Sequence, residues 1–405
     1  MKDPLDEASV DVSRGVAARI LLAVVVGLIA LAVFVPGVRV PLAIVTGIVV
    51  MVMLHEAGHY WAAKRTGMKV TEFFLGFGPR LWSFRRGETE YGVKALPLGG
   101  YVRIIGMNNT EEVPPEDEPR TYRQARYRDR LVVVLAGVTV NILIAFVLFA
   151  VVIMGNGIAR TSTTVAAIER DLPAHVAGLR PGDRILGVAN QPVDGWDELV
   201  SAIQARPDQK TPITIERDGE VFDLEATLAN RGGEGFLGVR PTTETESVGI
   251  VQAVPKSLDA MWDVTAGTGR ALARLVSPDG VSQYSKNFTS AAPKAGSTED
   301  LERPRSLVGI VDQGSDIVDD NVWALLWLLG GISLILALFN LIPLPPFDGG
   351  HAAIAVYEWA ASKITHRKVE VDYRKLMPVA AIVLAFFLTL SLSAMFLDVR
   401  DAVGR

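Results

Sequence analysis

Long apolar stretches constrain this 405-residue chain more than any other feature of its sequence. A helix needs about 20 mostly apolar residues to cross the hydrocarbon core of a bilayer. Stretches that meet this requirement occupy residues 17–36, 41–64, 129–154, 322–345 and 376–397. The mean hydropathy of +0.29 is also high for a soluble protein. The sequence therefore predicts a polytopic α-helical membrane protein.

The first stretch has two interpretations, a cleaved signal peptide or a membrane helix that stays in the protein. No small-residue cleavage pattern follows it, and four acidic residues precede it. These acids are Asp3, Asp6, Glu7 and Asp11. We therefore expect a cytoplasmic tail over residues 1–16 and an additional transmembrane helix over 17–36. Only residues 37–40 separate Pro36 from Pro41, which predicts a tight hairpin with the next helix.

Basic residues are concentrated in two of the connecting loops. Lys and Arg are frequent in the loop at 65–128 and again at 363–375, and such loops stay in the cytoplasm. We therefore expect residues 156–320 outside the cytoplasm, an N-terminus inside and a C-terminus outside. The predicted location is the cell membrane, which the chain would cross several times.

Charge and cysteine content exclude several classes of function. The net charge of −5 is spread along the chain and offers no basic face for nucleic acid. The chain has no cysteine, so it contains neither disulfide bonds nor thiolate metal sites nor a cysteine nucleophile. A metal would have to bind to His, Asp or Glu.

The second apolar stretch contains the motif HEAGH, from His55 to His59. Residues four apart lie on one face of a helix, so both imidazoles can bind one zinc ion while Glu56 reaches the water bound to it. Zinc lowers the pKa of its water to about 7, which suits hydrolysis. The alternative is a polar cluster that holds helices together, but ionisable residues at membrane depth usually mark a functional site.

A catalytic zinc site needs a third protein ligand. The best candidate is Asp348, in the segment NLIPLPPFDGGH that ends the fourth stretch and extends this membrane element to residues 322–351. Its three prolines must break the helix, and irregular backbone at membrane depth is tolerated where it lines a cavity. Alternatively, Asp348 caps a helix or turn, and His351 is the competing ligand.

Residues 160–235 read as a small soluble domain of strands, one helix and a hairpin at Asp218 and Gly219. The stretch GLRPGDRILGVANQPV resembles PDZ domains of bacterial envelope proteases, which bind an extended peptide at a sheet edge. The alternative is a β-rich spacer without a ligand. Residues 256–320 are expected to form an amphipathic helix over 256–275 and a linker over 279–304.

The HEAGH helix, the NLIPLPPFDGGH segment and the inserted PDZ-like domain together resemble the site-2 protease family of intramembrane metalloproteases, in its bacterial PDZ-containing branch. The stretches from Phe73 to Met107 and from Arg303 to Ile310 are similar to actinobacterial members. The resemblance covers about residues 42–397.

The resemblance implies one Zn²⁺ ion per chain, bound by His55, His59 and Asp348, with Glu56 as the base that activates water. Asn340 matches a family asparagine near the reaction centre, and Asn141 matches one expected to help hold the substrate strand. This chain departs from the family in two respects. It has Gly137–Val138 where many relatives have Gly–Pro, and it has the additional helix at 17–36.

Glycines in the 65–128 region resemble those of the membrane re-entrant β-hairpin loop of the family. They are Gly76, Gly78, Gly99 and Gly100. A transmembrane helix hides its peptide bonds in internal hydrogen bonds, so a protease has to unwind it and can hold the extended segment by edge pairing. The alternative is a plain cytoplasmic loop.

The resemblance implies cleavage of single-pass membrane proteins, such as anti-sigma factors already trimmed outside by another protease, or remnant signal peptides. The active site is expected toward the cytoplasmic leaflet, and the PDZ-like domain outside the cytoplasm as a size filter or sensor. The rivals are a non-catalytic membrane scaffold or transporter and a metalloprotease for soluble peptides. No internal repeat of the transporter kind is evident.

Overall fold

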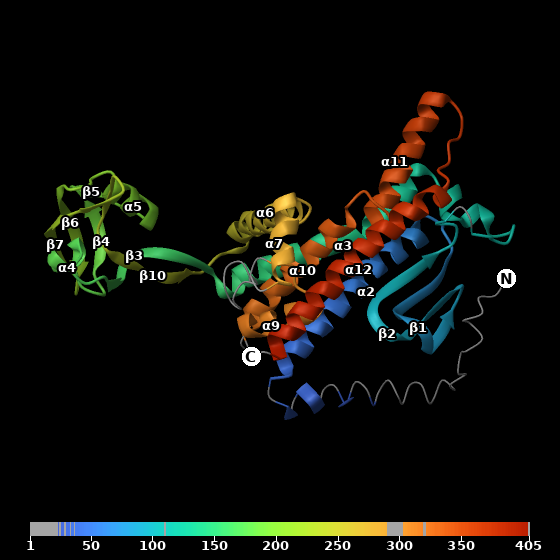
Figure 1. Cartoon of the computed structure of the whole chain (residues 1–405), viewed down its shortest axis with the longest axis horizontal. Coiled ribbons are helices and arrows are strands. Elements are labelled where there is room, and N and C mark those ends of the chain that lie inside the picture. Colours follow the sequence, from blue (N-terminus) through green and yellow to red (C-terminus); the bar gives the residue numbers. More distant parts are fainter. Residues whose placement is uncertain are drawn as a thin grey trace. The chain divides into compact units, whose positions relative to one another are not determined.

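The computed structural model describes residues 37–108, 111–289, 303–318 and 321–403, with isolated positions between 23 and 35. The chain forms two compact units (Figure 1). The sheet unit comprises Ile153–Ala253, and the membrane unit comprises the described residues before and after it. The expected tail at 1–16 and most of the expected helix at 17–36 lie outside the described residues.

Four helices in the described part of the membrane unit are long and apolar enough to cross a bilayer. They are α2 (Arg39–Arg65), α3 (Tyr127–Asn156), α10 (Val322–Asn340) and α12 (Tyr373–Val403). Glycine allows α2 and α3 to approach closely, because a Cβ at Gly58 would lie 2.9 Å from the carbonyl oxygen of Ala136. The prediction of a polytopic membrane protein is confirmed.

The segment 322–351 was expected as one membrane element, and the structure divides it. Helix α10 ends at Asn340, and α11 (Asp348–Thr365) begins eight residues further on. The intervening stretch contains Pro343, Pro345 and Pro346, which cannot donate backbone hydrogen bonds to a helix. The break therefore sets Asp348 in the first turn of a new helix.

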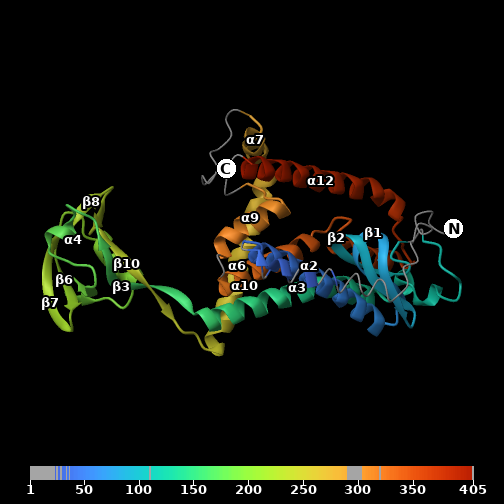
Figure 2. The same ribbon diagram turned by 90° about the horizontal axis from the view of Figure 1, so that it is seen from below.

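The region after α2 forms a hairpin of two long strands, β1 (Val70–Arg86) and β2 (Thr89–Ile104), each of which folds back on itself (Figure 2). Phe73, for example, pairs with both Tyr91 and Val102. The strand halves therefore lie in the order 99–104, 70–77, 89–96 and 80–86. Gly76 lies at a bend with φ +86°, a conformation that favours glycine.

Further elements complete the membrane unit. They are the 3₁₀ turns η1 (Glu118–Arg120) and η2 (Tyr122–Gln124) and the helices α6 (Ile250–Leu275), α7 (Pro278–Lys286) and α9 (Leu307–Val318). Part of the linker expected over 279–304 is helical, since α7 continues to Lys286. Its N-cap Ser277 accepts a hydrogen bond from Gly280, and Pro278 suits the first turn. Residues 290–302 lie outside the described part.

Buried ion pairs attach the segment before α9 to the end of α12. Arg303 lies 2.8 Å from Asp398 and 2.9 Å from Asp401. Asp398 also accepts hydrogen bonds from the backbone N–H and the hydroxyl of Ser306 at 2.8 and 2.7 Å. The RPRS sequence therefore holds two parts of the chain together that are almost 100 residues apart.

The sheet unit contains an antiparallel sheet in the order β10, β3, β4, β6, β7, with β5 beside β4. Its elements are β3 (Ile158–Ile168), α4 (Pro173–Val176), β4 (Arg184–Val188), β5 (Gln191–Pro192), α5 (Trp196–Gln204), β6 (Lys210–Arg217), β7 (Glu220–Thr227), β8 (Ala229–Arg231), β9 (Glu234–Phe236) and β10 (Val239–Glu246). Leu199, Ile213 and Ile215 are fully buried in its core. The hairpin expected at Asp218 and Gly219 joins β6 to β7. The unit is longer than the expected 160–235 because β10 pairs with β3.

Candidate metal centre

Two histidines on one face of α2 provide the first part of a candidate metal site. His55 and His59 are one helical turn apart and both are buried. Their Nε2 atoms lie 3.1 Å from one another. The HEAGH spacing therefore gives two imidazoles directed at one point, as the sequence predicts.

The carboxylate of Asp348 joins this pair from the first turn of α11. Its Oδ2 atom lies 3.2 Å from Nε2 of His55 and 3.2 Å from Nε2 of His59. The oxygen is buried and receives no hydrogen bond from the residues that the structure describes. A carboxylate oxygen in this position needs a positively charged partner.

The three donor atoms fit a zinc ion. Two ligands at about 2.0–2.1 Å from a tetrahedral zinc ion are about 3.3–3.4 Å apart, and the three separations here are 3.1, 3.2 and 3.2 Å. Two imidazole nitrogens and one carboxylate are also a common ligand set for catalytic zinc, which keeps its fourth position open. The three residues are the only such cluster found in the described part of the chain.

Helix α3 supplies the outer contacts of both histidines. Nδ1 of His59 lies 2.8 Å from the carbonyl oxygen of Val133. A carbonyl can only accept, so Nδ1 carries the hydrogen and Nε2 is free to bind metal. Nδ1 of His55 lies 3.2 Å from the side-chain nitrogen of Asn141. From the sequence, Asn141 was expected to help hold the substrate strand. In the structure its side chain contacts His55.

A glycine of α3 leaves the room that the site requires. A Cβ at Gly137 would lie 2.4 Å from Nε2 of His59 and 2.8 Å from Nε2 of His55. Any larger residue would therefore overlap the two imidazole nitrogens that point at the site. In the sequence, Gly137 was of interest only because a valine follows it. Its role in leaving room beside the two histidines was not predicted.

Glu56 lies beside the donor residues at the boundary between α2 and β2. A Cβ at Gly100 would meet Cγ of Glu56 at 3.3 Å and the sulfur of Met53 at 2.9 Å. The absence of a side chain at Gly100 therefore lets this strand pass directly over the helix that carries the histidines. Glu56 is half-buried.

The remaining residues that the sequence predicted for the site are Asn340, His351 and the glycines of the hairpin. Asn340 is the last residue of α10, and no hydrogen bond joins its side chain to the donors within the described residues. His351 lies one turn after Asp348 and its Nδ1 is 3.4 Å from the hydroxyl of Tyr373. Gly76, Gly78 and Gly99 have positive φ angles and lie at the bends of the hairpin.

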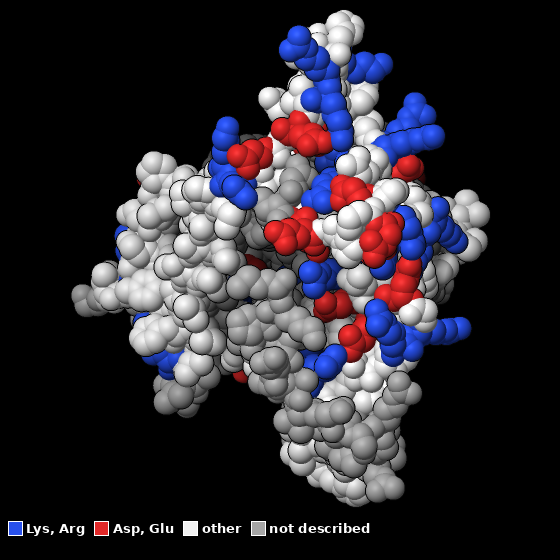
Figure 3. All heavy atoms as spheres, turned by 90° about the vertical axis from the view of Figure 1, so that its right-hand side faces the viewer, with Lys and Arg blue, Asp and Glu red and all other residues white. Residues whose placement is uncertain are grey.

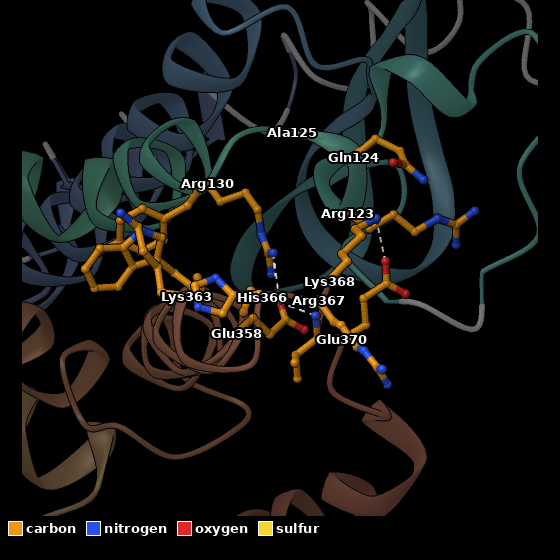
Figure 4. A pocket seen from close by; sticks show the side chains of 15 residues that line it. Arg123, Gln124, Ala125, Arg130, Glu358, Lys363, His366, Arg367, Lys368 and Glu370 are labelled. Atoms are coloured by element: carbon orange, nitrogen blue, oxygen red, sulfur yellow. Dashed lines mark hydrogen bonds and ion pairs between the residues drawn. The ribbon is translucent and has the colours of Figure 1, made fainter.

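A buried ion pair supports α11 behind Asp348. Arg130 donates to Oε2 of Glu358 at 2.6 Å, and Oε1 accepts from the backbone N–H of Val371 at 2.7 Å. The pair lies at the wall of a hollow of about 840 Å³, in which Lys368 and Glu370 form another pair (Figure 4). The three donors do not line this hollow. The sequence offered one signal for the pair, an acid among the apolar residues of α11.

Charged side chains surround this end of the membrane unit. Figure 3 shows Lys and Arg intermixed with Asp and Glu over one face. Glu88, in the turn between β1 and β2, contacts Lys64 of α2 at 2.5 Å and Arg120 of η1 at 2.7 Å. These contacts attach the tip of the hairpin to the last turn of α2.

Comparisons with known proteins agree with this geometry. The model of peptidase family M50 matches residues 43–386. The zinc metalloprotease Rip1 of Mycobacterium tuberculosis is 36% identical over 378 residues, which is 83% of this chain and 91% of that protein. Rip1 of Mycolicibacterium smegmatis is 33% identical, over 84% of this chain and 91% of its own length.

A relative outside the mycobacteria is also similar over most of its length. The metalloprotease MmpA of Caulobacter vibrioides is 30% identical over 347 residues, which is 78% of this chain and 85% of that protein. The matched region of the family model includes His55, His59 and Asp348. The chain therefore belongs to peptidase family M50, the site-2 protease family of membrane-embedded zinc metalloproteases.

Proposed function

We propose that this zinc metalloprotease hydrolyses a peptide bond within or next to the transmembrane segment of single-pass membrane proteins. His55, His59 and Asp348 would bind the zinc ion, and Glu56 would be the general base. The observation that carries the proposal is the meeting of Asp348 Oδ2 at 3.2 Å with both Nε2 atoms of α2, a helix long and apolar enough to span a bilayer.

The residues divide the chemistry between them. Zinc, when bound, supplies a water molecule of lowered pKa and polarises the carbonyl group of the substrate. Glu56 accepts a proton from the attacking water on its carboxylate and then donates it to the nitrogen of the departing amine. Val133 keeps His59 in the tautomer whose Nε2 is free, since its carbonyl oxygen accepts from Nδ1.

We infer that the substrate binds as an extended strand beside Glu56. The strand half at 99–104 pairs with residues 70–75 on one side only, and Gly100 approaches Glu56. Its other backbone edge can pair with an unwound segment of substrate, which would satisfy the peptide groups that leave their helix. Exposed Phe77, Leu81 and Leu96 on the same hairpin support a re-entrant position in the membrane.

The proposed topology places the metal centre toward the cytoplasmic leaflet of the cell membrane. The basic loops at 65–128 and 363–375 support this orientation. Residues 160–235, within the sheet unit, would then form a PDZ-like domain outside the cytoplasm that limits access by size or senses a peptide. Ligand-type clusters of His, Asp and Glu are absent from its described residues, which supports a regulatory role without chemistry.

The substrate class we propose is anti-sigma factors and similar regulators, and also remnant signal peptides, after another protease has removed their outer parts. A protease for soluble peptides is the competing function. The position of His55 and His59 on a helix long and apolar enough to cross a bilayer favours a membrane-spanning substrate. A reconstituted assay with one single-pass substrate and its excised soluble peptide separates the two functions.

The metal centre is tested by Asp348→Ala, with His351→Ala as the matched control one turn away. Asp348→Ala should lose zinc and proteolysis together, since even the loss of outer partners of a ligand weakens metal binding by about 10- to 100-fold. His351→Ala should keep stoichiometric zinc. Purified Asp348→Ala protein that holds zinc with the affinity of the wild type would refute the assignment.

A further inference from the structure

The side chain of Asn141 lies against His55, on the side of the ring away from the donor cluster. It is fully buried, and its amide nitrogen is 3.2 Å from Nδ1 of His55. Its amide oxygen is also buried and has no hydrogen-bond donor within the described residues. A buried carbonyl oxygen without a donor is costly and calls for an explanation.

The ring of His55 provides the missing donor. Its Nε2 atom faces Nε2 of His59 and Oδ2 of Asp348. When this nitrogen binds a metal, the hydrogen of the neutral ring must sit on Nδ1. The group that faces Nδ1 then has to accept a hydrogen bond. The nitrogen of an amide cannot do so, whereas its oxygen can.

Rotation of the amide of Asn141 about its last bond exchanges the two atoms. The two ends of the amide have nearly the same size and shape, so the rotation needs no movement of α3. The oxygen then accepts from Nδ1 of His55, and its missing donor is found. This is the arrangement in which a metal-binding histidine donates its second nitrogen to an outer acceptor.

The backbone around Asn141 is held in place independently. The hydroxyl of Ser333 in α10 donates to the carbonyl oxygen of Asn141 at 2.9 Å, and both residues are fully buried. The amide is therefore presented from a fixed point between two membrane helices. A fixed acceptor restrains the rotation of the imidazole more than a mobile one would.

We propose that Asn141 is a positioning residue for the zinc ligand His55. Its side-chain oxygen accepts a hydrogen bond from Nδ1 of His55 and thereby fixes the orientation and the tautomer of the imidazole ring. The family resemblance implied instead that Asn141 helps to hold the substrate strand. The positioning role rests on the proposed zinc centre, because it acts only through a metal-binding Nε2. His55 and His59 then have matched outer acceptors on α3, one from a side chain and one from the backbone.

Full-length protein with Asn141→Leu, Asn141→Ala and Asn141→Asp tests the proposal by zinc affinity, measured in competition with a chelator. The first two variants have no acceptor and should bind zinc about 10- to 100-fold more weakly. Asn141→Asp offers a carboxylate acceptor and should hold zinc within a few-fold of the wild type. The matched control is Asn287→Leu, since Asn287 is also buried but bonds the carbonyl of Tyr284.

Two further measurements separate this role from its alternatives. If Asn141 held substrate, Asn141→Ala would raise KM and leave zinc affinity unchanged, and that result would overturn the proposal. The absorption spectrum of the cobalt-substituted protein should change in Asn141→Ala and not in Asn287→Leu. If Asp348→Ala kept its zinc, the proposed centre itself would fail, whereas unchanged zinc affinity in folded Asn141→Leu and Asn141→Ala alone would refute only the positioning role.

Discussion

Arg130 in the first turn of α3 and Glu358 in the middle of α11 form a buried ion pair with a separation of 2.6 Å. The two side chains are 12% and 7% exposed, and the second carboxylate oxygen of Glu358 accepts from Val371. This pair joins the helix that contacts both histidines to the helix that begins with Asp348. The alignment of the metal centre thus depends on a contact outside it.

Glu358→Ala should destabilise the membrane unit by about 3–5 kcal/mol, because it leaves the buried guanidinium of Arg130 without its charge partner. Replacing both residues together, with Arg130→Met and Glu358→Leu, should restore most of the loss. Thermal unfolding in detergent measures the effect. The matched control is Glu370→Ala in the exposed pair with Lys368, which should change stability by less than about 1 kcal/mol. Equal effects of Glu358→Ala and Glu370→Ala would contradict the assignment.

Gly137→Ala should abolish zinc binding, since its Cβ would lie 2.4 Å from the metal-binding nitrogen of His59. The variant is informative because alanine otherwise favours a helix over glycine, by about 1 kcal/mol. Metal analysis of the purified protein checks the result. Gly331→Ala in α10 is the control, because a Cβ there meets none of the described atoms within 4 Å. Stoichiometric zinc in Gly137→Ala would place the metal elsewhere.

Much of the membrane unit could be predicted because hydropathy acts locally. The stretches at 41–64 and 129–154 became α2 and α3, each extended at both ends by residues outside the apolar run. The HEAGH spacing fixed the two histidines for the same reason, since one helical turn defines their geometry. The segment that supplies the third donor was predicted from the prolines before Asp348, because these prolines had to end a helix.

Contacts between distant segments were harder to predict. No local pattern indicates that β10 pairs with β3 or that the two hairpin strands fold back on themselves. The polar alternation of residues 239–246 fits a strand, but it does not indicate which other strand pairs with it. The role of Gly137 and the contact of Asn141 with His55 likewise depend on how α3 packs against α2, which the sequence of either helix does not specify.

Glu56→Gln should reduce proteolysis by about 10²- to 10⁴-fold, the contribution typical of a general base, while zinc stays bound. The amide is nearly the same size as the carboxylate but cannot accept the proton of the attacking water. Cleavage of a single-pass substrate in proteoliposomes, with zinc content measured on the same sample, tests both parts. Glu246→Gln in β10 is an exposed control. If Glu56→Gln cleaved the substrate at nearly the wild-type rate, Glu56 would not be the general base.

The sheet unit should lose stability in acid through Asp183. Burial opposes the ionisation of its carboxyl group, but hydrogen bonds from Arg217 at 2.6 Å and from the backbone N–H of Arg180 at 2.7 Å outweigh this effect and lower the pKa of Asp183. A pKa that is lower in the folded state stabilises the fold above the unfolded-state value of about 3.9. This stabilisation is lost as the pH falls through the lower, folded-state value.

Hydrogen exchange of β4 and β6 in the full chain, followed from pH 5 downward, measures this effect. The protection of these strands should fall below about pH 4 in the wild type, and Asp183→Asn should remove most of that dependence along with part of the stability at pH 5. Asp171→Asn, at an exposed position of the same unit, should behave as the wild type does. A pH dependence that persists in Asp183→Asn would exclude Asp183 as its origin.

The break between α10 and α11 has a consequence for the assembly of the protein. Because Asp348 begins a helix of its own, a metal ion shared with α2 is a reversible cross-link between two helices whose ligands lie almost 300 residues apart in the sequence. Anything that binds only the assembled form stabilises it, so the affinity for zinc and the association of these helices must rise and fall together. Depletion of zinc would then weaken the association of the helices throughout the membrane unit, in addition to its effect on the catalytic site.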